Sequence, residues 1–501
     1  MNTATKEILN KFDRLSAERK RFILGLPDDE DFAGAVYYVS AEGDDENDGK
    51  SPESAWRTLA KVSSFDFSAK DTVRFRRGDV FRGFVKTAPY VRYCAYGEGE
   101  KPRFYGWNKD LADPALWEIY DKDNCIWKLC EDILDCGTLV FNDGAAHSRK
   151  LIPSYRDGRF VCRYDESKEF VISREMTRDL DIFCKYDNTL TEKPSKGEDF
   201  PIPALDWNSL GELYLRCDAG NPGSVFSSIE ALTRRHMFFN SSNPGVSIDN
   251  LCLKYIGTHA ISAGRGTAGL HVSGCEIGWV GGAIQHYSGT DPNYPEGRRG
   301  SVTRYGNGVE IYGSCDDYIV KNCYIYQIYD AGITHQITTN GAPFTLSNVK
   351  YLGNLIENCV YSIEYFLDQN KGEDGSLIDG CEIADNILRL SGFGWGQQRH
   401  NVHTPAHVKG WSYRNTARNF SIHNNVFDRA AYRMIHTVAL DAASCPEMFE
   451  NTYIQKLGMP LGQYGSNRDG EPPNLVFDEN AEESIKSRFG DKNAEVYIIT
   501  D

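Results

Sequence analysis

Residues 322–325 read Asn-Cys-Tyr-Ile, and related four-residue segments recur along the second half of the chain. They are Asn250-Leu-Cys-Leu, Gly274-Cys-Glu-Ile, Asn354-Leu-Ile-Glu, Asn386-Ile-Leu-Arg and Asn425-Val-Phe-Asp. In chain order the six segments start 24, 48, 32, 32 and 39 residues apart, as expected for a period near 24 enlarged by loops. Asparagine suits the turn because it tolerates left-handed backbone angles and its amide can hydrogen-bond along a stack. The pattern predicts a solenoid of stacked short strands, a parallel β-helix.

Length and composition narrow the function classes. At 501 residues the chain exceeds the size at which a single compact core keeps growing. A formal net charge of −16 disfavours nucleic acid and anionic membranes as partners. No apolar run at the N-terminus is long enough for a signal peptide or a membrane span, so we expect a cytoplasmic protein. The fourteen cysteines are expected to be free thiols, several of them packed inside the repeats.

The chain divides into five expected segments. Residues 5–26 carry apolar residues at near-helical spacing, which predicts a helix that caps the open end of the solenoid. Residues 107–235 lose the repeat and show separate strand-like runs between turn clusters, which predicts a small inserted antiparallel β-domain. The expected order is a helical cap (1–35), first rungs (36–106), the inserted domain (107–235), the main β-helix with the catalytic face (236–470) and a C-terminal cap or tail (471–501).

One block of the sequence carries a family resemblance. Val36 opens the run Val-Tyr-Tyr-Val-Ser, and Asp71-Thr-Val-Arg-Phe-Arg-Arg-Gly-Asp and Phe81-Arg-Gly follow. This block resembles the opening segment of right-handed parallel β-helix enzymes that act on carbohydrates, the pectate-lyase-like superfamily. The resemblance covers residues 36–106 and 245–430. Within that group the chain is similar to glycoside hydrolases of the xylosidase and fucosidase type. The resemblance implies a right-handed coil, an insertion beside the cleft, and paired acids on consecutive rungs.

A second column of residues places acids on one face. Ile261, Ile284, Val309, Ile333 and Ile363 are spaced 23, 25, 24 and 30 residues apart and are expected to stack inward. Side chains alternate along a strand, so the next residue in each case points outward. The predicted outward column is Ser262, Gln285, Glu310, Thr334 and Glu364. With strands about 4.8 Å apart, the backbones of Glu310 and Glu364 are expected to lie roughly 10 Å apart.

The catalytic residues are expected among these acids. Glu364 lies in the aromatic strand Tyr361-Ser-Ile-Glu-Tyr-Phe, where desolvation should raise its pKa toward use as a general acid. Asp330 precedes the neighbouring strand and is its expected partner, with Glu310 as the substitute. Each could equally be a solvated surface charge or close a turn. In the xylosidase pattern the acid position falls on Phe366, two residues beyond Glu364.

Other polar and aromatic groups near the column are candidate sugar-binding residues, with turn bonding or core packing as the alternative for each. They are His286, His335, Gln336, Asp368, Trp395 and Arg399. Two places in the sequence suggest metal sites: the histidines His400, His403 and His407, and the acidic turn at residues 44–49. Pro405 breaks a helical histidine pair, and position 55, where a calcium loop needs an acid, is Ala. No metal and no cofactor are expected.

These observations favour a glycoside hydrolase that cleaves oligosaccharides or polysaccharides with two carboxylates. A polysaccharide lyase acting on uronates stays open, because Arg298, Arg299 and Arg304 could hold a substrate carboxylate. The third hypothesis is a non-catalytic solenoid that binds carbohydrate. The sequence leaves open which sugar and linkage are cleaved, whether the configuration is retained or inverted, and whether the action is exo or endo. It also leaves open the role of the inserted domain and the oligomeric state, with a homo-oligomer as one option.

Overall fold

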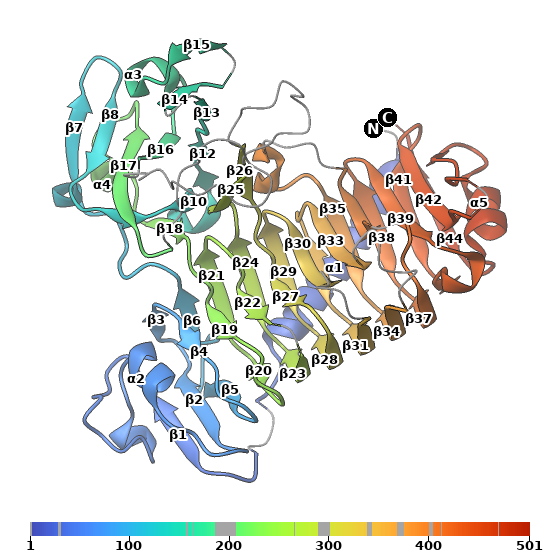
Figure 1. Ribbon diagram of the computed structural model, residues 1–501, viewed down its shortest axis with the longest axis horizontal. Helices are drawn as coiled ribbons and strands as arrows, with labels where there is room; N and C mark the ends of the chain where they lie inside the picture. The colour runs from blue at the N-terminus through green and yellow to red at the C-terminus, as the bar shows by residue number, and fades with distance from the viewer. Residues whose placement is uncertain are drawn as a thin grey trace.

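The computed structural model describes residues 3–28, 32–156, 159–163, 165–185, 207–264, 266–288, 301–337, 343–367, 375–399, 404–411, 413–468 and 470–500. Three long sheets of parallel strands wind around one elongated core (Figure 1). The predicted fold is confirmed: the chain is a right-handed parallel β-helix with an inserted antiparallel β-domain and an N-terminal helix. In the described residues, no helix is both long enough and apolar enough to cross a membrane.

Each turn of the coil contributes one strand to each sheet. Sheet A stacks β1 (Val36–Val39), β2 (Thr72–Arg76), β5 (Arg92–Tyr96), β20 (Ser247–Asp249), β23 (Thr267–Ser273), β28 (Cys315–Lys321), β31 (Thr345–Leu352), β34 (Leu377–Ala384), β37 (Ala417–His423) and β40 (Glu447–Phe449). Sheet B stacks β3 (Val80–Arg82), β6 (Arg103–Tyr105), β21 (Cys252–Ile256), β24 (Glu276–Val280), β29 (Tyr324–Ile328), β32 (Leu355–Glu357), β35 (Ile387–Ser391), β38 (Val426–Ala430), β41 (Thr452–Lys456) and β44 (Glu495–Ile499). Sheet C stacks β4 (Val85–Lys86), β19 (Phe238–Asn240), β22 (Ile261–Ala263), β27 (Val309–Tyr312), β30 (Ala331–Ile337), β33 (Tyr361–Leu367), β36 (Ala406–Gly410), β39 (Arg433–Ala439) and β42 (Pro460–Ser466), with β43 (Leu475–Val476) antiparallel at its edge.

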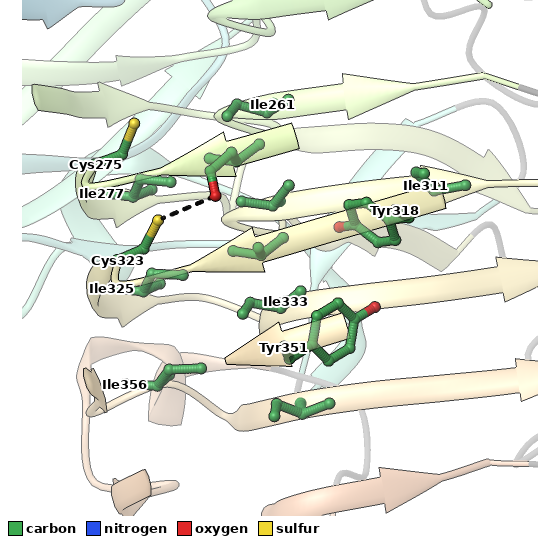
Figure 2. Packing of buried hydrophobic residues seen from close by; sticks show 14 of the residues in the cluster. Ile261, Cys275, Ile277, Ile311, Tyr318, Cys323, Ile325, Ile333, Tyr351 and Ile356 are labelled. Carbon is green, nitrogen blue, oxygen red and sulfur yellow. Dashed lines mark hydrogen bonds between the residues drawn. The ribbon is translucent and has the colours of Figure 1, made fainter. Parts of the chain in front are cut away.

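The core is built of side chains repeated rung after rung. Ile277, Ile325 and Ile356 occupy the same register position of β24, β29 and β32 and are fully buried (Figure 2). The predicted packing of the repeat cysteines is confirmed, because Cys252, Cys275, Cys323, Cys359 and Cys381 are all buried. Burying one isoleucine side chain stabilises a fold by roughly 1.5–3 kcal/mol, so the stack is the main source of stability.

The predicted asparagine turn consists of two adjacent columns. Asn250, Gly274 and Asn322 have positive φ angles of 57°, 60° and 50°, at the turn that leads from sheet A into sheet B. In the later rungs this position belongs to Gly353, Asp385, Asn424 and Glu450, also with positive φ. The asparagines quoted there lie one residue further on and bond to each other: Asn354 donates to Asn386, Asn386 to Asn425 and Asn425 to Asn451. Aligning all six segments on one position was therefore wrong by one residue for the later three.

A hairpin interrupts the predicted period. Ile261 of β22 pairs directly with Val309 of β27, and no rung of sheet C lies between them. The intervening β25 (Ile284–Ser288) pairs antiparallel with β26 (Ser301–Arg304) instead. The prediction that Ile284 and Gln285 belong to the stacked column is therefore wrong. Ile261 and Val309 are 48 residues apart because the hairpin is inserted before β27, and not because a further rung lies between them.

The N-terminal helix is present but does not cap an end. α1 (Thr3–Leu24) lies along the flank of the solenoid, beside the turn between sheets A and B (Figure 1). Its Ile23 packs with Tyr324, Leu355 and Ile387, and its Phe12 packs with Ile454 and Ile499. The apolar stripe of the helix thus spans several rungs. The ends are covered by α2 (Leu59–Ser64), whose Leu59 and Val62 are buried, and by α5 (Ala481–Ser484) with the helical turn Ile485–Phe489.

The inserted segment forms a separate layered unit above the early rungs (Figure 1). Its main sheet orders β12 (Arg149–Lys150), β16 (Asp181–Lys185), β17 (Leu210–Arg216), β8 (Ile126–Leu129) and β7 (Trp117–Asp121), with β9 (Ile133–Leu134) on β17. A smaller sheet holds β13 (Ser154–Arg156), β14 (Arg159–Cys162) and β15 (Asp165–Glu169), and α3 (Ile172–Glu175) and α4 (Pro222–Val225) complete the unit. β10 (Cys136–Phe141), β11 (Ala146–His147) and β18 (Ile229–Thr233) extend sheet B into the insertion. The residue boundaries of the five segments stay predictions.

Candidate active site

The outward face of sheet C carries the predicted column of acids. The register places Ser262, Glu310, Thr334, Glu364 and Lys409 side by side on consecutive strands. The inward neighbours Val309, Ile333 and Ile363 are fully buried in the core, so the alternation inferred from the sequence holds. Glu310 and Glu364 are two strand spacings apart, roughly 10 Å at their backbones.

A cleft of about 990 Å³ opens over this column. Its walls come from residues at both ends of the sheet C strands, from the hairpin, and from Trp207 of the inserted domain. The lining residues are Trp207, His236, Phe239, Ser241, His259, Ser262, Ala263, Gly264, Gln285, Tyr305, Asn307, Glu310, Tyr312, Asp330, Gln336, Glu364, Phe366, Leu367, Arg399 and Trp411. The volume and the mixture of aromatic and polar groups suit an organic ligand of several rings.

Glu310 is a buried carboxyl group at the floor of the cleft. The side-chain amide of Asn307 donates to its Oε2, and His259 Nδ1 lies 3.3 Å from the same oxygen. Burial is the main cause that raises the pKa of Glu310 to about 7, with a smaller contribution from the charge of Asp330 and an opposing one from Asn307. His259 Nδ1 accepts the backbone N–H of Asn307 at 2.9 Å, so the neutral ring carries its proton on Nε2. Glu310 is thus partly protonated near pH 7.

Glu364 is more strongly shifted. Only 5% of the residue is exposed, and Gln336 Nε2 donates to its Oε2 at 3.0 Å. Burial raises the pKa of Glu364 well above its usual range, the charge of Asp330 adds to the rise, and Arg399 opposes it. A protonated carboxyl in such a place can donate its proton to a leaving group.

Asp330 is the charged member of the group. It lies at the start of β30, at the edge of the cleft, and forms an ion pair with the guanidinium of Arg399. Arg399 comes from the segment after the short helical turn Trp395–Gln398, so residues 69 positions apart in sequence meet here. Glu310, Asp330 and Glu364 line the same cleft, and the charge of Asp330 contributes to raising the pKa of both glutamates.

The cleft therefore brings together Glu310, Asp330, Glu364, Gln336 and Arg399. Two other candidates lie elsewhere, and both expectations are corrected. His335 is fully buried and points into the core, where Nδ1 bonds the hydroxyl of Tyr351 and the ring stacks on Tyr365, because it alternates with the outward Thr334. Trp395 is 2% exposed, packs on Tyr329 and donates to the carbonyl of Gln327, so it braces the wall.

Several of the candidate residues lie wholly or partly outside the described residues. His286 lies on β25, with its side chain outside the description. Asp368, Arg298 and Arg299 belong to residues outside the described ranges, as do His400 and His403. His407 is buried and bonds Ser391. In the described residues, no group of three or more histidine, cysteine and acidic side chains has a metal-binding arrangement.

The structure also places residues in or near the cleft that the sequence prediction did not include. Trp207, His236 and Trp411 line it, and Lys409 lies beside Glu364 in the column. Lys409 is 3% exposed, and burial lowers its pKa to about 7. Lys409 continues the outward column past Glu364. It was not predicted because the spacing of 45 residues from Ile363 to Val408 is far from the expected period.

Comparison with known proteins gives limited information. No family model matches the sequence, and no curated protein is similar to it at a significant level. Solved structures with a similar course of the chain include XylC in complex with xylose, with 11% identity and a TM-score of 0.41 over 92% of this chain and 82% of that one. They also include a GH136 lacto-N-biosidase from Eubacterium ramulus (11% identity, TM-score 0.36, 93% and 68% of the two chains) and a polygalacturonase from Erwinia carotovora ssp. carotovora (9%, 0.34, 86% and 94%). Since these TM-scores lie below 0.5, the fold rests on the strand pairings of this chain, and its chemistry rests on the cleft.

Proposed function

We propose that the protein is a glycoside hydrolase that cleaves oligosaccharides with two carboxyl groups of the cleft. The observation that carries the proposal is the gathering of three carboxyl groups, those of Glu310, Asp330 and Glu364, in one cleft on one face of the solenoid. Asp330 forms an ion pair with Arg399, while burial raises the pKa of Glu310 and of Glu364. Glycoside hydrolysis requires such a pair, because one group must give a proton as the other attacks or activates water.

In this proposal Glu364 protonates the glycosidic oxygen as the bond to the anomeric carbon breaks. The Asp330 carboxylate either attacks the anomeric carbon or takes a proton from the water that does so. Glu310 is the substitute for Asp330 as the partner of Glu364. Gln336 holds the carboxyl of Glu364, and Arg399 holds that of Asp330, so both groups are oriented before the substrate binds.

The lyase alternative has less support. Its sequence signal included Arg304, but that guanidinium is buried and donates to the backbone carbonyls of Gly282 and Gly137. Among the described lining residues the cation is Arg399, which is already paired with Asp330. In this described part of the cleft, a uronate would therefore meet carboxyl groups and a guanidinium that Asp330 already holds.

The test is turnover of aryl-glycosides and neutral oligosaccharides by the wild-type protein, Glu364→Gln and Asp330→Asn. We expect kcat to fall by about a thousandfold in each variant, because each removes a proton-transfer or nucleophilic step without changing volume. Tyr120→Ala, at an exposed site on the inserted domain, is the control and keeps wild-type kcat. Turnover that survives both changes would rule out this pair. Products that absorb as unsaturated sugars would instead establish a lyase.

A further inference from the structure

One end of the cleft is walled by a row of nearly parallel rings. Trp207 and His236 have ring centroids 5.6 Å apart with planes inclined by 24°. His236 lies 5.2 Å from His259 at 8°, and His259 lies 5.9 Å from Tyr305 at 28°. Phe239 joins the row at 5.6 Å from His236 and 22°. All five rings line the same cleft as the acids.

The row joins the two parts of the molecule. Trp207 belongs to the inserted segment, three residues before β17, whereas His236 and Phe239 lie at the entry to sheet C. The guanidinium of the buried Arg234 lies 5.9 Å from the centre of the Trp207 ring. Trp207 is thus held between a cation and an imidazole, and 39% of it is still exposed, as is 39% of Phe239. Exposed aromatic rings held rigidly inside a cleft are a surface that costs little entropy to bind on.

The two imidazoles add directional polar groups. Thr258 donates its only hydroxyl proton to the carbonyl of Arg235, so the contact of 3.2 Å between Thr258 Oγ1 and His236 Nδ1 requires the ring to donate. His236 then offers Nε2 as an acceptor, and His259, protonated on Nε2, offers a donor. Burial lowers the pKa of His236 to about 4 and that of His259 well below its usual range, so both rings are neutral at pH 7.

We infer that Trp207, His236 and Phe239 form a binding subsite for a sugar ring of a neutral oligosaccharide, at the end of the cleft remote from Glu364. The inference deepens the proposed function, since it assigns the substrate class of that same site. A sugar ring has an apolar face that fits an aromatic platform and hydroxyl groups at its edge that fit a neutral donor and acceptor. A uronate carboxylate would find neutral imidazoles there and acids beyond.

The position of this subsite fixes its role. Phe239 lies on β19, two strand spacings from Glu310 on β27 and four from Glu364 on β33, which is about 10 Å and 19 Å. A ring bound on Trp207 is therefore not the ring being cleaved at Glu364. Binding energy gained there anchors the chain and orients the bond between the acids. The inserted domain takes part in substrate binding through one tryptophan.

The test measures binding separately from turnover. The Glu364→Gln protein, in which hydrolysis is slow, is titrated calorimetrically with xylotriose, cellotriose, maltotriose and trigalacturonate. We expect a neutral trisaccharide to bind, and Trp207→Ala in the same background to weaken its Kd by about tenfold or more, as loss of an aromatic contact does. Trp207→Phe keeps most of the affinity because a stacking ring remains. Tyr120→Ala, exposed on the inserted domain, is the matched control and stays within about twofold of the parent.

Each contrary outcome has a distinct meaning. Unchanged affinity in Trp207→Ala, absence of binding by all three neutral sugars, or tightest binding of trigalacturonate each overturns the inference. If the wild-type protein hydrolyses glycosides but Trp207→Ala binds normally, the proposed function stands and the subsite does not. If the wild-type protein hydrolyses nothing but sugar binding depends on Trp207, the subsite stands and the hydrolase does not.

Discussion

Glu310 links the chemistry of the cleft to the stability of the fold. Burial raises its pKa from 4.5 to about 7, so between these values the folded protein keeps a proton that the unfolded chain releases. The stabilisation is fully present below pH 4.5 and is lost as the pH rises through 7, because the folded state then has to hold a buried charge.

This sign gives a prediction for Glu310→Gln, which keeps the acceptor for Asn307 but cannot ionise. Relative to the wild type, the variant should gain up to about 3 kcal/mol of unfolding free energy between pH 4.5 and pH 8. Urea unfolding at the two pH values measures the difference. Glu46→Gln, at an exposed glutamate, is the control and should show no comparable gain. A constant difference between Glu310→Gln and wild type at both pH values would contradict the shifted pKa.

At the level of single residues, the sequence was informative where alternation decides the direction of a side chain. Glu310 and Glu364 follow a buried aliphatic residue in each strand, so their outward position could be predicted. The same rule argues against His335 as a cleft residue, because it lies two residues after Ile333 and therefore points inward. Trp207 could not be predicted, since its place in the cleft depends on how the inserted domain lies against the solenoid.

At the scale of the element, the asparagine ladder holds successive turns together. Asn386 is fully buried, accepts the backbone N–H of Asn354, and donates to the carbonyl of Tyr351 and to Asn425. Its amide thus hydrogen-bonds to backbone and side-chain groups of neighbouring turns. The period near 24 could be read from the sequence, but the one-residue offset between the turn position and the ladder could not, since asparagine suits both.

Removing one member of the ladder should be costly. Asn386→Ala removes the buried hydrogen bonds to the N–H of Asn354, the carbonyl of Tyr351 and the side chain of Asn425, so we expect a loss of about 2–5 kcal/mol in unfolding free energy. Urea titration followed by circular dichroism measures it. Asn480→Ala is the matched control, because Asn480 is exposed and its side chain caps no helix bond, and its effect should stay within about 0.5 kcal/mol. Equal effects of the two changes would mean that the ladder contributes no stability.

At the scale of the whole molecule, a buried ion pair of the inserted domain lies at its junction with the solenoid. Asp135 is fully buried, bonds the ammonium of Lys150, and accepts the backbone N–H of Ile284 in the hairpin. Burial opposes its charge, but Lys150 and Arg234 outweigh burial and lower the pKa of Asp135. Arg234 also lies under Trp207, so the same junction supports the row of rings in the cleft.

Breaking this pair on one side should destabilise the junction more than removing both charges. We expect Lys150→Met to cost about 3–5 kcal/mol, because the Asp135 carboxylate is left buried without its cation, and Asp135→Leu combined with Lys150→Met to recover part of the loss. Chemical unfolding of the single and double variants tests this. A double variant that is less stable than Lys150→Met alone would show that Lys150 is not the main partner of Asp135.

The flanking helix has a consequence for the order in which the chain is made. α1 is synthesised before the rungs it packs on, and the surfaces that bury Phe12 and Ile23 extend from residue 324 to residue 499. Thr5 even bonds the carbonyl of Thr500. At about 5–20 residues per second, the ribosome needs roughly 24–95 seconds after completing α1 to deliver the last of these strands. Until then the part of the apolar stripe around Phe12 lacks its native partners Ile454 and Ile499, so a helix made before the solenoid completes its docking only after the last rungs are made.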